Sequence, residues 1–156
     1  MVKWLSIAGW IVVGVGIFLG FLYLGQDWEK SLAIVTVMTA GVEGVIGFVR
    51  HFFLYKADMK RLGWETDRPD WVWEVGFANL GFGLMALLAV FAGFGVKAQA
   101  LVLLGYALYL FQAAMLHLYR YLTDETRSPA RLWRAVMLTL VIVVMMAFFA
   151  VYALLQ

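Results

Sequence analysis

Cysteine is absent from this chain of 156 residues, and charged residues make up only 14% of it. Without cysteine the chain can form no disulfide framework, zinc ribbon, thiol nucleophile or iron–sulfur cluster. A soluble domain carries about 25% charged residues, so the low charge content excludes an ordinary globular domain. The net charge of +2 is small and is not gathered in a tail. We therefore expect no nucleic-acid partner.

Sequence motifs of several common catalytic sites are also missing. The chain contains no H-E-x-x-H pair for zinc, no G-x-x-x-x-G-K-[ST] phosphate loop and no G-x-S-x-G nucleophile elbow. What it has in abundance is hydrophobic residues, at 65% of the chain. The composition indicates an integral membrane protein and leaves open whether it catalyses a reaction.

Five apolar runs are each long enough to cross a bilayer. A hydrocarbon core about 30 Å thick needs roughly 20 apolar residues in a helix. The runs are too long, and alternate too little, for barrel strands. Both prolines, Pro69 and Pro129, fall between the runs, where helices should end. We therefore predict an all-α polytopic membrane protein with a single transmembrane domain, whose five spans cover residues 4–25, 31–55, 71–95, 98–122 and 132–155.

Lysine and arginine are distributed unevenly between the two ends of the predicted bundle. One end has the short connections Gln26–Lys30 and Val96–Lys97, and the other has the longer loops Lys56–Asp70 and Thr123–Arg131. Because basic residues favour the cytoplasmic side, we predict a cytoplasmic N-terminus and an external C-terminus in a plasma membrane. The basic end holds Lys3, Arg50, Lys56, Lys60, Arg61, Arg68, Arg120, Arg127, Arg131 and Arg134, against Lys30 and Lys97 at the other.

Small residues mark where the helices should approach each other, because lipid gives no hydrophobic driving force for helix association. The fifth predicted span has no glycine, so we expect it to lie at the edge of the bundle or to face a partner. That partner would be a second copy of the chain or another subunit of a membrane complex. The other contact positions are Gly16 and Gly20 in the first span, Gly41, Gly44 and Gly47 in the second, and Gly76, Ala78, Gly81 and Gly83 in the third.

Polar side chains inside the spans require an explanation, since a charge at the bilayer centre costs at least about 2.5–3.5 kcal/mol. Glu43 is the deepest, near the middle of the second span. Arg50 follows seven residues later on nearly the same face, roughly 10 Å further along the axis. The remaining polar groups fall in the half of the bilayer next to the basic end. The predicted ligand site is a polar wedge open to the cytoplasm, formed by Arg50, His51, Glu74, Asn79, Gln112, His117 and Arg120.

Several functions fit this pattern. The wedge could bind an amphipathic ligand such as a quinone or a lipid, with Arg50 and Arg120 as anion contacts, within a redox or membrane-stress assembly. Glu43 could instead carry protons or cations in a small transporter, or be a structural acid bonded to a neighbouring helix. The chain could also be a non-catalytic subunit of a larger complex. A two-His, one-carboxylate metal site is a further alternative that no spacing motif supports; its ligands would be His51, Glu74 and His117.

Part of the sequence resembles a known family. The segments are His51-Phe52-Phe53, then Gly63-Trp64, then W-E-V-G-F-A-N-L-G-F-G over residues 73–83, followed by the single later histidine His117. They resemble an uncharacterised family of small prokaryotic integral membrane proteins. The likeness covers residues 47–120, and its most specific part is the block 74–83. The resemblance implies that His51, Glu74, Asn79 and His117 form one constellation, and it implies no reaction.

The same region is more loosely similar to DoxX-type membrane proteins, in which an acid and glycines open the helix after a short loop. This chain departs from that pattern, because Asp67-Arg68-Pro69 replaces the usual loop and five spans replace four. DoxX-like proteins are associated with quinone-linked redox systems. The resemblance therefore favours a quinone or lipid as the ligand of the wedge.

Overall fold

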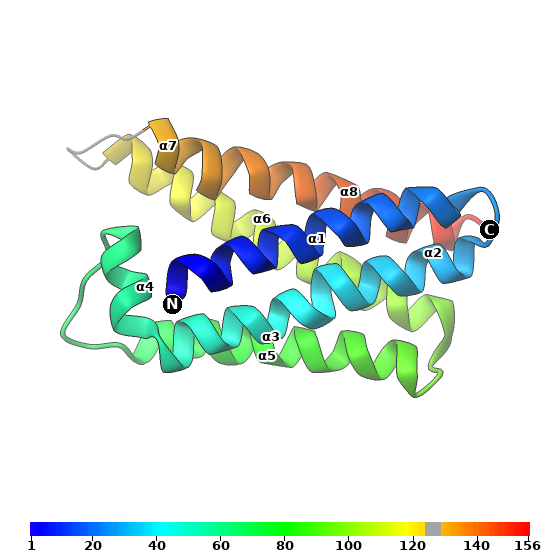
Figure 1. Cartoon of the computed structure of the whole chain (residues 1–156), viewed down its shortest axis with the longest axis horizontal. Coiled ribbons are helices and arrows are strands. Elements are labelled where there is room, and N and C mark those ends of the chain that lie inside the picture. Colours follow the sequence, from blue (N-terminus) through cyan, green and yellow to red (C-terminus); the bar gives the residue numbers. More distant parts are fainter. Residues whose placement is uncertain (124–128) are drawn as a thin grey trace.

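The structure is a computed structural model that describes residues 1–123 and 129–156. Five long helices run side by side, with the N-terminus and the C-terminus at opposite ends of the bundle (Figure 1). The fold prediction is confirmed, because all regular secondary structure of the described residues is helical and each predicted span matches a long apolar helix to within four residues at either end. These helices are Val2–Leu24, Trp28–Phe53, Asp70–Phe91, Gly95–Thr123 and Trp133–Leu154.

The second span is a continuous helix whose winding changes along its length. The Asp27 side chain caps its start by accepting a hydrogen bond from the Lys30 backbone N–H at 2.9 Å. Two π-helical segments, one on each side of a short α-helix, follow the first turns. Such segments are rare and occur frequently at functional sites. In chain order the pieces are α2 (Trp28–Val35), η1 (Thr36–Val42), α3 (Glu43–Phe48) and η2 (Val49–Phe53).

The segment between the second and third spans contains a helix that the sequence analysis took for loop. This helix, α4 (Tyr55–Leu62), folds back across the end of the bundle that carries the N-terminus (Figure 1). It ends at Gly63, whose φ of 72° places it in the left-handed region that suits glycine at a helix end. The buried side chains of Met59, Trp64 and Val72 pack together and hold α4 to the following segment.

The remaining spans are α1 (Val2–Leu24), α5 (Asp70–Phe91), α6 (Gly95–Thr123), and α7 (Pro129–Leu132) running through η3 (Trp133–Met137) into α8 (Leu138–Leu154). The predicted connection Val96–Lys97 is wrong, because both residues already lie inside α6. Of the predicted loop Thr123–Arg131, residues 124–128, Arg127 included, lie outside the described residues.

Glycines allow the second and third spans to touch backbone to backbone. A Cβ atom on Gly44 would lie 2.6 Å from the Asn79 carbonyl oxygen and 2.8 Å from Gly83 Cα, so only glycine fits there. Gly41 and Gly47 also lie against α5, as their spacing predicts. Glycine thus sets the close contact that brings the polar residues of the two helices together.

The fifth span packs into the core on one face and is exposed on the other, and its contact with a partner stays a prediction. Met146, Phe149 and Ala150 of α8 are almost fully buried in the core together with Leu103 and Tyr106 of α6. The absence of glycine does not prevent this packing, because alanine and the flexible methionine side chain fill the space between α8 and α6. The opposite face of α8 is apolar and exposed, through Val141, Val144, Phe148, Val151 and Leu154.

Candidate functional site

A buried aspartate gathers basic side chains at the end of the bundle covered by α4. The Asp58 side chain is 0% exposed. Arg61 donates hydrogen bonds from Nε and Nη2 to Asp58 Oδ1 at 2.9 and 2.7 Å. His51 Nδ1 lies 3.1 Å from Oδ2, and Arg50 Nη2 lies 3.6 Å from the same oxygen. These four residues, which we call the Asp58 cluster, fasten α4 to η2.

The surroundings of Asp58 keep its carboxyl group ionised. Burial by itself raises the pKa of this group, because it penalises the charged form. The hydrogen bond with His51 and the charges of Arg50, His51 and Arg61 outweigh burial and lower the pKa of Asp58 well below its ordinary value. The carboxylate is therefore charged at neutral pH and acts as a fixed anion between three basic side chains.

Glu43 meets the same arginine from deeper in the bundle. Arg50 Nη1 lies 3.7 Å from Glu43 Oε1, so the spacing of seven residues does bring the two groups together. Glu43 Oε2 is buried and has no hydrogen-bond partner within residues 1–123 and 129–156. The carboxylate lies against Gly9 of α1, where a Cβ atom would collide with it. Arg50 thus connects the mid-membrane carboxylate to the Asp58 cluster.

Neutral polar groups form a second cluster, between α5 and α6. Asn79 Nδ2 donates to the Val75 carbonyl oxygen at 2.7 Å and to the Tyr109 hydroxyl at 3.0 Å. Its Oδ1 accepts a hydrogen bond of 2.8 Å from the Tyr106 hydroxyl. Tyr106 is almost fully buried, at 1% exposed. We call Asn79, Tyr106 and Tyr109 the Asn79 cluster, and each of its polar side chains has a hydrogen-bond partner.

Buried hydroxyl groups continue from Glu43 towards the opposite end of the second span. Ser31, Thr36 and Thr39 are all 0% exposed. Ser31 donates to the Gly20 carbonyl oxygen of α1, and Thr39 donates to the carbonyl oxygen four residues before it, each at 2.7 Å. Thr36 Oγ1 is buried without a hydrogen-bond partner among the described residues. Polar side chains therefore recur in the interior from the start of the second span to α4.

An aromatic platform joins the segment after α4 to the end of α6. The Trp64 ring stacks on the His117 imidazole, with centroids 4.5 Å apart and an interplanar angle of 21°. The Arg120 guanidinium lies 5.5 Å from the Trp64 ring, within reach of a cation–π interaction. Trp71 contacts the same indole at 5.8 Å. Trp64 is therefore held between the third span and the end of the fourth. We call Trp64, Trp71, His117 and Arg120 the Trp64 platform.

The residues of the predicted wedge lie in several separate places in the structure. Arg50 and His51 belong to the Asp58 cluster, Asn79 to the cluster named after it, and His117 and Arg120 to the Trp64 platform. Glu74 and Gln112 are exposed on the outer faces of α5 and α6. The suggested ligands His51, Glu74 and His117 are not brought together, and the described residues contain no group of three potential metal ligands.

Sequence reasoning missed Asp58, Trp64, Tyr106 and Tyr109. One signal for Asp58 was available, because Asp58 and Arg61 have the i, i+3 spacing of an ion pair on a helix. The two tyrosines lie in an apolar run, where nothing local distinguishes a hydrogen-bonded ring from one that faces lipid.

Five apolar helices, with a few polar side chains in a mostly apolar interior and an aromatic, basic end, define a multi-pass helical membrane protein. The model of one family matches residues 3–155, nearly the whole chain. The chain belongs to that family, DUF6790, which is a family of unknown function. No match was found among curated proteins or among solved structures.

Proposed function

We propose that the protein is a small proton- or cation-coupled membrane transporter in which Glu43 carries the coupled ion. One observation carries the proposal: a carboxylate in the bundle interior has one oxygen paired with Arg50 and the other without a hydrogen-bond partner in the described residues. Ten residues separate Glu43 from the end of the span at Phe53, or about 15 Å, half of a hydrocarbon core about 30 Å thick. An ionisable group at that depth points to function unless shown otherwise.

The surroundings of Glu43 support this role on both sides. Towards the basic end, Arg50 connects it to the Asp58 cluster. Towards the other end, the buried hydroxyl groups of Ser31, Thr36 and Thr39 provide polar groups in an otherwise apolar interior. A carboxylate that exchanges its partner between arginine and an incoming cation or proton needs both the basic partner and polar groups along the path to it.

The test measures the flux of protons or cations that a pH gradient drives across the membrane of proteoliposomes containing the full chain. We expect Glu43→Gln to abolish the flux, because the amide keeps the shape but cannot take up a proton or pair with a cation. Glu29→Gln is the matched control, since Glu29 lies exposed in the first turn of the same span. Equal flux for the wild type and Glu43→Gln would remove Glu43 from the mechanism.

A second candidate is the binding of an amphipathic, quinone-like or lipid-like ligand at the same end. It is favoured by a cluster of rings on the outside of η2 and α5, where Phe52 and Phe77 have centroids 5.1 Å apart and Phe53 is 65% exposed. Flat rings of this kind can stack on a quinone head group. Native mass spectrometry should show less co-purified ligand after Phe53→Leu and Phe77→Leu, and unchanged retention would count against this candidate.

We propose that the N-terminus is cytoplasmic and the C-terminus external, in the plasma membrane of a prokaryote. The support is the excess of lysine and arginine at the end that carries α4, together with the family resemblance given above. A reporter enzyme fused after Gln156 should show that the C-terminus lies outside the cytoplasm. A reporter signal from the cytoplasm would contradict the proposed orientation.

A further inference from the structure

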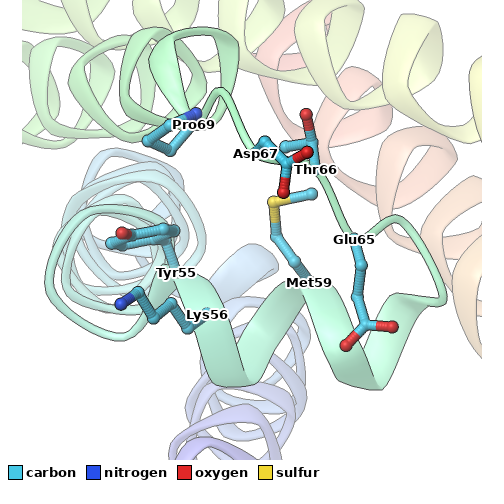
Figure 2. A pocket seen from close by; sticks show the side chains of 7 residues that line it. All are labelled: Tyr55, Lys56, Met59, Glu65, Thr66, Asp67 and Pro69. Carbon is cyan, nitrogen blue, oxygen red and sulfur yellow. The ribbon is translucent and has the colours of Figure 1, made fainter.

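We propose that the pocket beside α4 binds a phosphoethanolamine group, which carries a primary ammonium and a phosphate. The pocket has a volume of about 630 Å³ and lies between α4 and the segment that leads to the third span (Figure 2). We call it the interfacial pocket. It is lined by Tyr55, Lys56, Met59, Glu65, Thr66, Asp67 and Pro69.

The location of the pocket places it at the level of lipid headgroups. Its lining residues all fall between Phe53, where the second span ends, and Asp70, where the third begins. The headgroup layer extends roughly 5–8 Å beyond the hydrocarbon core on each side. The Tyr55 ring meets Trp73 edge to face at 5.8 Å, which is the kind of aromatic contact that marks this layer.

The charges that line the pocket have opposite signs on opposite sides. Figure 2 shows Tyr55 and Lys56 on one side, and Thr66 and Asp67 on the other, with the Met59 side chain next to Asp67. Within the described part of the chain, neither Lys56 nor Asp67 has a partner of opposite charge, whereas the neighbouring Arg68 pairs with Asp70 at 3.3 Å. A lysine on one side suits a phosphate, and a carboxylate on the other suits an ammonium.

The same lining discriminates between headgroups. A glycerol phosphate headgroup could place its phosphate against Lys56, but it has no ammonium to pair with Glu65 and Asp67. A choline headgroup cannot donate hydrogen bonds to a carboxylate, and its usual site is a cage of several aromatic rings, whereas Tyr55 is the one aromatic ring among the described residues that line this pocket. A primary ammonium can donate to the Asp67 carboxylate while the phosphate meets Lys56.

The experiment is native mass spectrometry of the full chain titrated with phosphatidylethanolamine, phosphatidylcholine and phosphatidylglycerol of the same acyl chains. We expect the wild type to prefer phosphatidylethanolamine by up to about fivefold, the upper limit that one exposed charge pair sets. Asp67→Asn should remove the preference. Lys56→Gln should weaken the binding of all three lipids and keep the preference, because it loses only the phosphate contact that they share. Lys97→Gln and Glu29→Gln, exposed charges at the other end of the bundle, should keep it.

Each outcome decides the matter. Equal binding of the three lipids by the wild type would mean annular lipid only and would overturn the site. A preference that persists in Asp67→Asn, with weaker binding of all three lipids in Lys56→Gln, would leave a plain phosphate site and overturn the ammonium contact. Competition by soluble O-phosphoethanolamine supports the site and makes the free molecule its ligand, whereas no competition supports the lipid. Because Glu43 does not line the pocket, this experiment and the flux assay can fail independently.

Discussion

Two carboxylates share Arg50 but lie in different surroundings. Asp58 is fully buried outside the spans and lies close to three basic side chains, two of them on η2 and one on α4 itself. Glu43 lies within the second span and meets one basic side chain at 3.7 Å. Each carboxylate has one oxygen without a hydrogen bond in the described residues, but that oxygen of Asp58, Oδ2, lies 3.1 Å from His51 Nδ1. The shared arginine is 3.6 Å from Asp58 and 3.7 Å from Glu43, so distance alone does not distinguish the two pairs.

The two carboxylates differ in how their basic neighbours would be paired if the carboxylate charge were removed. Removing the charge of Asp58 leaves three basic groups without their common anion, so this group is fixed as a structural anchor. Removing the charge of Glu43 frees Arg50, which still has Asp58 nearby. Under the proposed function, structure and ion carriage would be divided between neighbouring acids, with stability depending on Asp58 and transport on Glu43.

The largest expected effect is that of Asp58→Asn. Breaking a buried ion pair from one side costs about 3–5 kcal/mol. At Asp58 we expect the lower end, about 3 kcal/mol, because the Arg61 side chain is 34% exposed and Arg50 still lies 3.7 Å from Glu43. We expect the free energy of unfolding in mixed micelles to fall by that amount. Asp70→Asn is the control, since the Asp70–Arg68 pair is exposed and exposed pairs contribute about 0.2–1 kcal/mol. Similar losses for both variants would refute the role of Asp58 as an anchor.

The second effect is the pH dependence of the stabilisation by Asp58, which can be at most as large as the first effect. Because the pKa of Asp58 is lowered in the folded state, its stabilisation is fully present above the ordinary aspartate pKa of about 3.9. That stabilisation is lost as the pH falls towards the folded-state pKa. The difference in unfolding free energy between the wild type and Asp58→Asn should therefore be smaller at pH 3 than at pH 7. A constant difference would mean that the charge of Asp58 is not what stabilises the fold.

A smaller effect is expected at the Asn79 cluster, which contains no carboxylate and no histidine. Tyr106→Phe removes the hydrogen bond to Asn79 Oδ1 and leaves that buried oxygen without its donor. Hydrogen bonds inside membrane proteins contribute about 0.6 kcal/mol on average and at most about 1.7. We expect a loss of unfolding free energy in that range and of equal size at pH 3 and pH 7. A loss that changes with pH would couple this cluster to the ionic groups.

The smallest effect is expected at Gly9→Ala. The new Cβ atom collides with the end of the Glu43 side chain, which is flexible and can move aside. We therefore expect a cost of less than about 0.5 kcal/mol, below the roughly 1–3 kcal/mol of overpacking in a rigid core. In a Glu43→Ala background the same substitution should cost nothing, because the collision is gone. An equal cost in both backgrounds would show that the cost of Gly9→Ala does not come from its collision with Glu43.

The spans were predictable because hydropathy and length dominate in a bilayer. A backbone in lipid must satisfy its own hydrogen bonds, so an apolar run of sufficient length leaves helix as the only structure for a lone segment. The close approach at Gly41, Gly44 and Gly47 was predictable for a related reason, since small side chains are the main local signal for helix contact. Neither argument gives the rotation of each helix about its axis.

That rotation is why the site was only partly predicted. The contact of Glu43 with Arg50 follows from spacing within one helix, and it was expected. Glu74 and Gln112 were assigned to the interior by depth alone, but they face outwards, and depth carries no information about the face. Asp58 was missed because its burial depends on α4 folding back over the bundle, and only tertiary contacts establish that fold.

The length of α6 has a consequence for how the protein sits in a membrane. Its 29 residues span about 43 Å, whereas the hydrocarbon core is about 30 Å thick. A helix with such a surplus either tilts or projects into the headgroup layer. His117 and Arg120 occupy its last turns and carry the Trp64 platform. Both the tilt and the projection of α6 would depend on the thickness of the bilayer, so a thinner or thicker bilayer would change where Trp64, His117 and Arg120 lie relative to the headgroup layer.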